Sequence, residues 1–171
     1  MSIDPAAARA FPAFADLDDR SVDDLRARLR PIRLRPGGTL FRKGDANASL
    51  YLLIEGSVDI VEAPDDGRPV ATRAARTVIG ELGLLLNVPR TATVVAGTDV
   101  LCWELTQQAF SAAIERGEPW AARLALAVAS ELAARFVDVR VELTRLDADG
   151  HAHKPAELEQ LRTRLLAEWA F

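Results

Sequence analysis

Hydrophobic positions along the chain fall into three zones that differ in their spacing. Through "FPAFADLDDRSVDDLRARL" apolar residues recur at helical spacing, which predicts one or two short helices with Asp18 and Ser21 as plausible caps. From Ile32 to Glu104 short apolar runs are separated by turn residues, a pattern typical of strands. After Thr106 the helical spacing returns. This order predicts a β domain with helices at both ends.

The middle zone contains eight apolar runs of strand length: "IRL", "TLF", "SLYLLIEG", "SVDIVEA", "VATRA", "TVIG", "TATVVA" and "VLCWEL". Their short length and nearly even spacing predict a compact all-β roll or barrel. Within this zone "APDDGRPV" predicts a hairpin tip, because Asp66-Gly67 favours a turn geometry with positive φ.

A short helix is expected in "TQQAFSAAIERG", and a long helical run follows Pro119 and extends to about Leu146. Apolar residues in the long run fall at alternating steps of three and four, the heptad spacing of helix pairing: Ala122, Ala125, Ala129, Leu132, Phe136, Val139, Leu143 and Leu146. We expect the alanine-rich first half to pack on the roll and the bulkier second half to form a homodimer through the 119–146 helix. The alternative is that this whole face covers the core of its own chain.

The last part of the chain is first polar and then amphipathic. "DADGHAHKP" interrupts the long helix, and "PAELEQLRTRLLAEWAF" predicts a terminal helix with one apolar face, formed by Leu158, Leu161, Leu165 and Trp169. We therefore divide the chain into a domain at 1–146 and a linker with a terminal helix at 147–171.

Composition narrows the possible classes of protein. The 171 residues carry a net charge of -4 and are 49% hydrophobic, which fits one well-filled domain with a helical appendage. The acidic balance with scattered arginines argues against nucleic-acid partners. Cys102 is the one cysteine and lies in an apolar run, so we expect a small core residue in a reducing cytoplasm. No segment approaches the roughly 20 apolar residues of a membrane span.

The stretch "IGELGLLLNVPRTATVV", residues 79–95, combines an acid, a base and two glycines within apolar sequence. Gly80 and Gly83 have no side chains, so their amides can approach a ligand closely. A short helix at 82–86 would add free N-terminal amides. Arg90 could donate a forked pair of hydrogen bonds to a phosphate, and Glu81 could accept from a sugar hydroxyl. Together these residues predict a small nucleotide site.

"GELGLLLNVPRTATV" resembles the phosphate-binding cassette of the cyclic nucleotide-binding domain, and the resemblance extends from about Phe11 to Leu146. It implies a mainly β fold with flanking helices: an eight-stranded antiparallel, jelly-roll-like β-roll, N-terminal helices, a short cassette helix and C-terminal helices. It also implies that the amide of Gly80 and the side chain of Glu81 bind the ribose 2′-hydroxyl. Arg90 and the amides of Gly83 and Thr91 would bind the cyclic phosphate, with Leu82 in the same loop.

The ligand implied by the resemblance is cAMP or cGMP, with no further cofactor and no metal. A threonine after the cassette arginine goes with cGMP in the related kinases, but channels that prefer cAMP carry it too. We expect the base to contact Ile60, Val70 and Arg135, the last from the long helix; a solvated role for Arg135 stays open.

The chain departs from the family in two places. Arg76-Thr77 stands where the family usually has a Gly-Asp turn before the cassette. Regulators of transcription in the family carry a helix-turn-helix domain after the long helix, whereas about 25 residues follow it here. We therefore expect a stand-alone cytoplasmic sensor without a DNA-binding domain, which signals by moving the long helix against an unknown effector protein.

Two alternatives remain from the sequence. In the first, the domain has lost its ligand, Glu81 and Arg90 pair with each other, and the chain is a dimerisation or docking module. In the second, the chain is an enzyme. Cys102 has no histidine near it in sequence, and His151 and His153 lie in a polar linker, so we expect neither a nucleophile nor a metal site.

Overall fold

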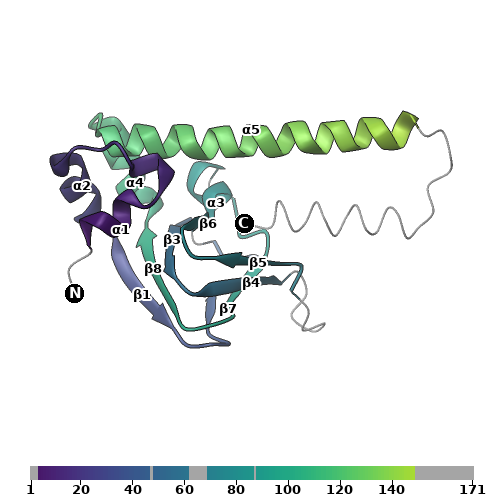
Figure 1. The fold of residues 1–171 in the computed structure, drawn as a ribbon, viewed down its shortest axis with the longest axis horizontal. Coiled ribbons are helices and arrows are strands. Elements are labelled where there is room, and N and C mark those ends of the chain that lie inside the picture. Colours follow the sequence, from purple (N-terminus) through teal and green to yellow (C-terminus); the bar gives the residue numbers. More distant parts are fainter. Residues whose placement is uncertain (1–3, 47, 62–68, 87, 149–171) are drawn as a thin grey trace.

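A computed structural model describes residues 4–46, 48–61, 69–86 and 88–148. Eight strands form a roll, and the helices lie along one side of it (Figure 1). In chain order the elements are α1 (Pro5–Arg9), the 3₁₀ helix η1 (Pro12–Phe14), α2 (Asp19–Arg26), β1 (Arg30–Leu34), β2 (Thr39–Phe41), β3 (Leu50–Glu55), β4 (Ser57–Val61), β5 (Ala71–Ala74), β6 (Thr77–Ile79), α3 (Glu81–Leu86), β7 (Thr93–Ala96), β8 (Val100–Leu105), α4 (Gln107–Glu115) and α5 (Pro119–Ala148).

The strands form two four-stranded sheets in the orders β1-β8-β3-β6 and β2-β7-β4-β5, and every pairing is antiparallel. The prediction of an eight-stranded antiparallel roll with flanking helices is therefore confirmed. β4 and β5 pair as a hairpin, but the expected tip at Asp66-Gly67 lies outside the described residues.

β3 joins the two hydrophobic cores because its alternate side chains point to opposite faces. Tyr51 and Leu53 lie in the core between the sheets, whereas Leu50 and Leu52 lie in the core under the helices. Burial on both faces explains why this strand is a nearly continuous apolar run rather than an alternating one.

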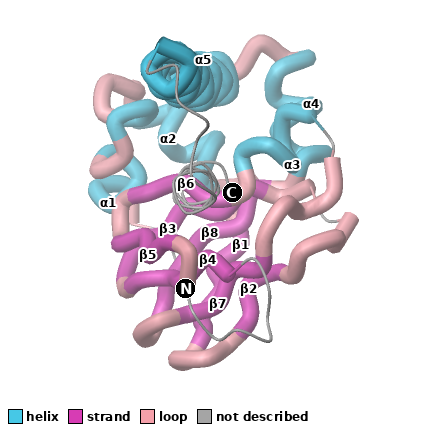
Figure 2. Tube along the Cα trace, turned by 90° about the vertical axis from the view of Figure 1, so that its right-hand side faces the viewer, coloured by secondary structure: helices cyan, strands magenta, loops and turns pink. Residues whose placement is uncertain are grey.

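The helices cover one side of the roll. Figure 2 shows α1 and α2 on one flank, α3 and α4 on the other, and α5 lying across them. The Asp18 side chain caps α2 by accepting a hydrogen bond from the backbone N–H of Ser21, 2.8 Å away, as predicted. Ser21 itself is buried inside the helix, so its expected role as a cap is wrong.

The N-terminal half of α5 packs on η1, α2 and α4. Its fully buried residues are Trp120, Ala121, Leu124 and Val128. Ala122 and Ala129 are exposed, so the expectation that these alanines pack on the roll is wrong. Trp120 fixes the rotation of the helix, because its indole is buried and its Nε1 donates to the Glu118 carboxylate at 2.6 Å.

Among the described residues no helix is long and apolar enough to cross a membrane. α5 runs to Ala148 and so crosses the expected boundary between 146 and 147. The predicted terminal helix lies in residues 149–171, which are outside the described part of the chain. His151 and His153 fall in the same segment.

Candidate functional site

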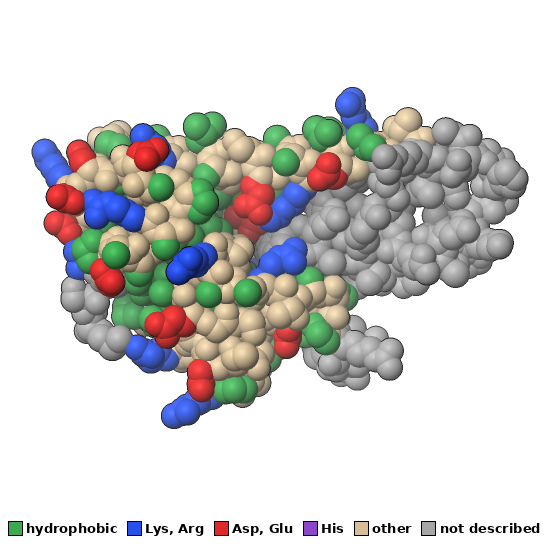
Figure 3. Space-filling view, viewed as in Figure 1, with side chains coloured by type: hydrophobic (Ala, Val, Ile, Leu, Met, Phe, Trp, Pro, Cys, Tyr) green, Lys and Arg blue, Asp and Glu red, His purple; other side chains and the backbone are tan. Residues whose placement is uncertain are grey.

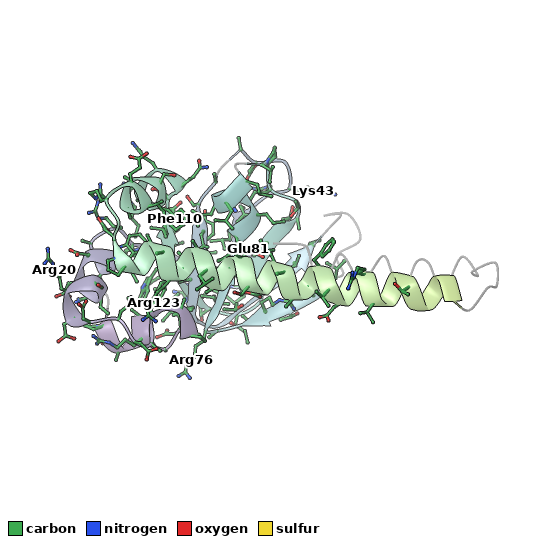
Figure 4. All side chains as sticks on the ribbon, turned by 90° about the horizontal axis from the view of Figure 1, so that it is seen from above. Arg20, Lys43, Arg76, Glu81, Phe110 and Arg123 are labelled. Carbon is green, nitrogen blue, oxygen red and sulfur yellow. The ribbon has the colours of Figure 1, made fainter. Side chains whose placement is uncertain are left out.

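The cassette runs from β6 through α3 to β7 and lies beneath α5. Figure 4 looks down on α5 and places Glu81 close beside that helix. The predicted short helix is confirmed, and it begins at Glu81, one residue earlier than expected. The cassette thus connects the inside of the roll with the underside of the long helix.

Arg90 is a buried cation, with 3% of its surface exposed. Its Nη1 donates to the carbonyl oxygen of Gly80 at 3.3 Å, and its Nη2 donates to the carbonyl oxygen of Ser49. The backbone of Arg90 is held on both sides, since its N–H donates to the carbonyl of Asp45 at 2.9 Å and its carbonyl accepts from the N–H of Gly44 at 2.8 Å. The loop before β3 therefore fixes Arg90 in place.

Gly80 and Gly83 make room for the guanidinium of Arg90. Gly80 has a φ of 88°, and a Cβ at this position would lie 2.4 Å from Nη1 of Arg90. A Cβ at Gly83 would lie 3.0 Å from the same nitrogen. The guanidinium therefore leaves no room for a side chain at Gly80, whereas a Cβ at Gly83 would require it to shift by a few tenths of an ångström. The absence of side chains also permits the close approach of a ligand that the sequence suggests.

Glu81 is equally buried, with 3% of its surface exposed. Its Oε1 accepts from Nη1 of Arg135 at 2.9 Å, while its Oε2 is buried and has no hydrogen-bond partner among the described residues. Burial raises the pKa of Glu81, and the charge of Arg135 opposes that rise. A buried carboxylate oxygen without a donor is costly, and a hydroxyl donor placed beside this oxygen would remove that cost.

Arg135 reaches Glu81 from α5 and also donates to Glu131, one helical turn earlier on the same helix. The structure thus brings together five of the predicted site residues, Gly80, Glu81, Gly83, Arg90 and Arg135. The partners of Glu81 and Arg90 differ: Glu81 bonds to Arg135, whereas Arg90 bonds to backbone carbonyls.

The remaining predicted residues lie in α3, next to Arg90 in the chain, or in the core between the sheets. Leu82 is half-buried on α3, and Thr91 is exposed directly after Arg90. Ile60 is fully buried in the core between the sheets, and Val70, whose N–H donates to the Ile60 carbonyl at 2.8 Å, packs against that core. Contact of Ile60, Val70 or Arg135 with a base stays a prediction.

Three residues around Arg90 were not predicted from the sequence. The Ser49 carbonyl accepts from its guanidinium, and the rings of Phe41 and Tyr51 lie 4.1 and 5.5 Å from its Cζ. Burial lowers the pKa of Arg90, but the nearby Tyr51, Asp45 and Glu104 oppose that effect. An internal cation of this kind is suited to an anionic ligand.

Comparison with known families identifies the domain. A family model described as "Cyclic nucleotide-binding domain" matches residues 31–117, just over half of the chain. The chain belongs to this family. The matched region contains every strand except the first residue of β1, and it contains the whole cassette.

Individual relatives support this assignment. The N-terminal domain of a transcriptional regulator from Streptomyces coelicolor A3(2) is 35% identical, covers 75% of this chain and 91% of that chain, and superposes with a TM-score of 0.64. The acetyltransferase Pat of Mycolicibacterium smegmatis is 35% identical over 59% of this chain and 31% of that protein. The cAMP-dependent protein kinase regulatory subunit of Candida albicans is 33% identical over 57% of this chain and 20% of that protein. The chain therefore spans a third or less of these two curated relatives.

Proposed function

We propose that this chain binds a cyclic nucleotide, cAMP or cGMP, in the cassette and reports binding through α5 to a partner protein. The observation that carries the proposal is the pair of buried polar groups in the cassette. Arg90 is a buried guanidinium, and Glu81 is a buried carboxylate with one oxygen lacking a donor among the described residues. A ligand with one phosphate and a sugar hydroxyl offers an anion to the guanidinium and a hydrogen-bond donor to the carboxylate.

The roles in this proposal follow the chemistry of each group. The guanidinium of Arg90 takes the cyclic phosphate, because forked N–H donors match phosphate oxygens. The backbone amides of Gly83 and Thr91 add donors at the same anion. Oε2 of Glu81 accepts from the ribose 2′-hydroxyl, and the amide of Gly80 lies beside it in the chain.

The choice between cAMP and cGMP depends on Thr91 in this proposal. Thr91 is exposed next to Arg90, and a threonine hydroxyl can accept a hydrogen bond from the amino group of guanine. The match to a cAMP-dependent kinase regulatory subunit supports cAMP as a ligand. Replacing Thr91 with Ala should therefore change the ratio of the two affinities more than the affinity for cAMP.

The contact between Glu81 and Arg135 supports a role for α5 in signalling. The same carboxylate that would accept the ribose hydroxyl receives a hydrogen bond from the long helix. A ligand that changes the position of Glu81 therefore acts directly on α5. Such a ligand can shift the helix only by its difference in affinity between the helix positions.

The outward face of α5 supports a homodimer. Leu126 and Phe136 are 69% and 60% exposed, and Val137 and Val141 are also exposed. Figure 3 shows hydrophobic side chains in a row along the upper side of the molecule, over α5. With Ala122, Ala129 and Ala133 they form a stripe at helix-pairing spacing, turned toward solvent. We propose this outer stripe, rather than the face that covers the chain's own core, as the dimer seam.

A thermal-shift measurement tests the binding proposal. At about 100 times its dissociation constant a ligand adds about 2.7 kcal/mol of stability, so cAMP or cGMP should raise the melting temperature clearly. The Arg90→Ala variant should show a much smaller rise at the same concentrations. If neither nucleotide moves the melting temperature of the parent at millimolar concentration, the alternative of a docking module without ligand is favoured.

A further inference from the structure

Two aromatic rings lie under the guanidinium of Arg90. Phe41 ends β2 in one sheet, and Tyr51 lies in β3 of the other sheet. Their rings are stacked, with centroids 5.7 Å apart and an angle of 28° between the planes. Cζ of Arg90 lies 4.1 Å from the centre of the Phe41 ring and 5.5 Å from that of Tyr51. We call this stacked pair the aromatic shelf.

The shelf and the backbone carbonyls use different parts of the guanidinium. The face of an aromatic ring attracts the cation through its quadrupole and takes up no N–H donor, whereas the hydroxyl of Tyr51 is hydrogen-bonded to Arg90. The carbonyls of Ser49 and Gly80 accept from Nη2 and Nη1, which are at the edge of the planar group. A guanidinium has five N–H groups, so its face can stay on the shelf while its edge exchanges one hydrogen-bond partner for a phosphate.

Burial makes the contact with the shelf strong. Phe41, Tyr51 and Arg90 are all buried, and cation–π attraction increases when the partners are removed from water. The long arginine side chain has many rotamers, and an arginine that sampled them before binding would lose conformational entropy when a ligand binds. A guanidinium that is already held in one orientation loses less conformational entropy, and this favours binding.

We propose that Phe41 and Tyr51 are positioning residues, which hold the guanidinium of Arg90 in the orientation that receives the phosphate of the ligand. The inference rests on the proposed binding of a cyclic nucleotide and adds a part of the site that lies outside the cassette. Both rings also pack in the core between the sheets. The test must therefore separate cation binding from packing.

Progressive fluorination of Phe41 makes this separation. Replacing Phe41 with mono-, di- and trifluorophenylalanine weakens the attraction for a cation with little change in ring size. The dissociation constant for cAMP should rise stepwise, by about three- to thirtyfold over the series, while the melting temperature stays close to that of the parent. The same series at Phe14, a buried ring in the other core, is the matched control and should leave the affinity unchanged.

The second ring is tested by two variants of Tyr51. Tyr51→Phe keeps the ring and removes the hydrogen bond between the Tyr51 hydroxyl and Arg90. It should lower the affinity for cAMP less than Tyr51→Leu, which removes the aromatic face as well. Equal affinities along the Phe41 series, with unchanged melting temperatures, would overturn the proposal. Equal effects at Phe41 and Phe14 would also overturn it, since they would indicate packing alone.

A measurement on the protein without ligand tests the contact between Arg90 and the aromatic shelf separately from the binding of a cyclic nucleotide. In protein labelled with ¹⁵N-arginine, the guanidinium of Arg90 should show restricted rotation in NMR spectra, and rotation should speed up along the Phe41 series. If the parent binds no cyclic nucleotide but rotation responds in this way, the binding proposal fails and the shelf stands. If rotation is unaffected by fluorination, the shelf is wrong whether or not cAMP binds.

Discussion

Gly80 shows how one residue can serve both the backbone and the site. An alanine there would adopt a left-handed conformation and would also place its Cβ 2.4 Å from Nη1 of Arg90. Gly37 has a similar φ of 82°, but a Cβ there would have nothing within 4 Å. A Cβ at Gly80 would also lie 2.9 Å from the carbonyl oxygen of Ser49, so the two positions differ in whether Arg90 and this carbonyl must move.

We predict that Gly80→Ala and Gly37→Ala each lower the free energy of unfolding by about 1 to 2 kcal/mol through the backbone. Only Gly80→Ala should also weaken cyclic-nucleotide binding, because it displaces the guanidinium. Chemical denaturation and calorimetric titration measure the two effects. If Gly80→Ala and Gly37→Ala bind cyclic nucleotide with the same affinity, the position of the Arg90 guanidinium is not needed for ligand binding.

The buried carboxylate of Glu81 should make stability depend on pH. Its pKa in the folded protein is raised above the ordinary value of 4.5, so the folded state holds the proton more tightly than the unfolded state. The stability that this proton gives is fully present below the unfolded pKa and is lost as pH rises through the folded pKa.

The Glu81→Gln variant has no carboxyl group at this position, so it does not lose stability in this way as the pH rises. Without ligand, the free energy of unfolding of the variant minus that of the parent should therefore increase as the pH rises from about 4 to about 7. Urea titrations across that range measure the difference. A difference that stays constant or shrinks as the pH rises would contradict the burial of a charged Glu81.

Residues of the site could be predicted where their type is unusual for their surroundings. Glu81 and Arg90 are charged residues in apolar sequence, and this contrast revealed them. Ser49 contributes only a backbone carbonyl, which every residue has, so no residue type could mark it. Phe41 and Tyr51 look like ordinary strand residues, because the cation above them comes from a residue far along the chain.

At the scale of elements, periodicity predicted the kinds of structure but not the rotation of α5. The spacing of Ala122, Ala125 and Ala129 indicated a face for close packing, yet Ala122 and Ala129 are exposed. The reason is Trp120, whose large buried ring and bond to Glu118 turn the helix so that Leu124 and Val128 face the core. One large anchor outweighs a stripe of small side chains, because it buries far more apolar area.

The link between Arg135 and Glu81 should carry the response of α5 to ligand. We predict that Arg135→Met reduces the change in hydrogen exchange along residues 129–148 that cyclic nucleotide causes in the parent. Asp138→Ala, at an exposed position on the same helix that lies off the outer stripe, is the control and should respond like the parent. An Arg135→Met protein whose α5 responds fully to ligand would contradict coupling through this ion pair.

At the scale of the whole molecule, the outer stripe of α5 should decide the oligomeric state. We predict that the parent is a dimer in sedimentation velocity and that Leu126→Glu makes it monomeric, since a charge in a helix seam is strongly unfavourable. The Asp138→Ala variant changes an exposed position of α5 that lies off the stripe, and it should remain dimeric. A monomeric parent, or a dimeric Leu126→Glu, would contradict the seam.

Calorimetric titration with cAMP, cGMP and 5′-AMP tests the central claim most directly, because it measures binding and its dependence on a cyclic phosphate together. We predict saturable binding of cAMP or cGMP at one site per chain and much weaker binding of 5′-AMP. Arg90→Ala should lose about 2 to 4 kcal/mol of binding free energy, as expected for a buried charged contact. No binding of either cyclic nucleotide, or equal binding by Arg90→Ala, would contradict the account.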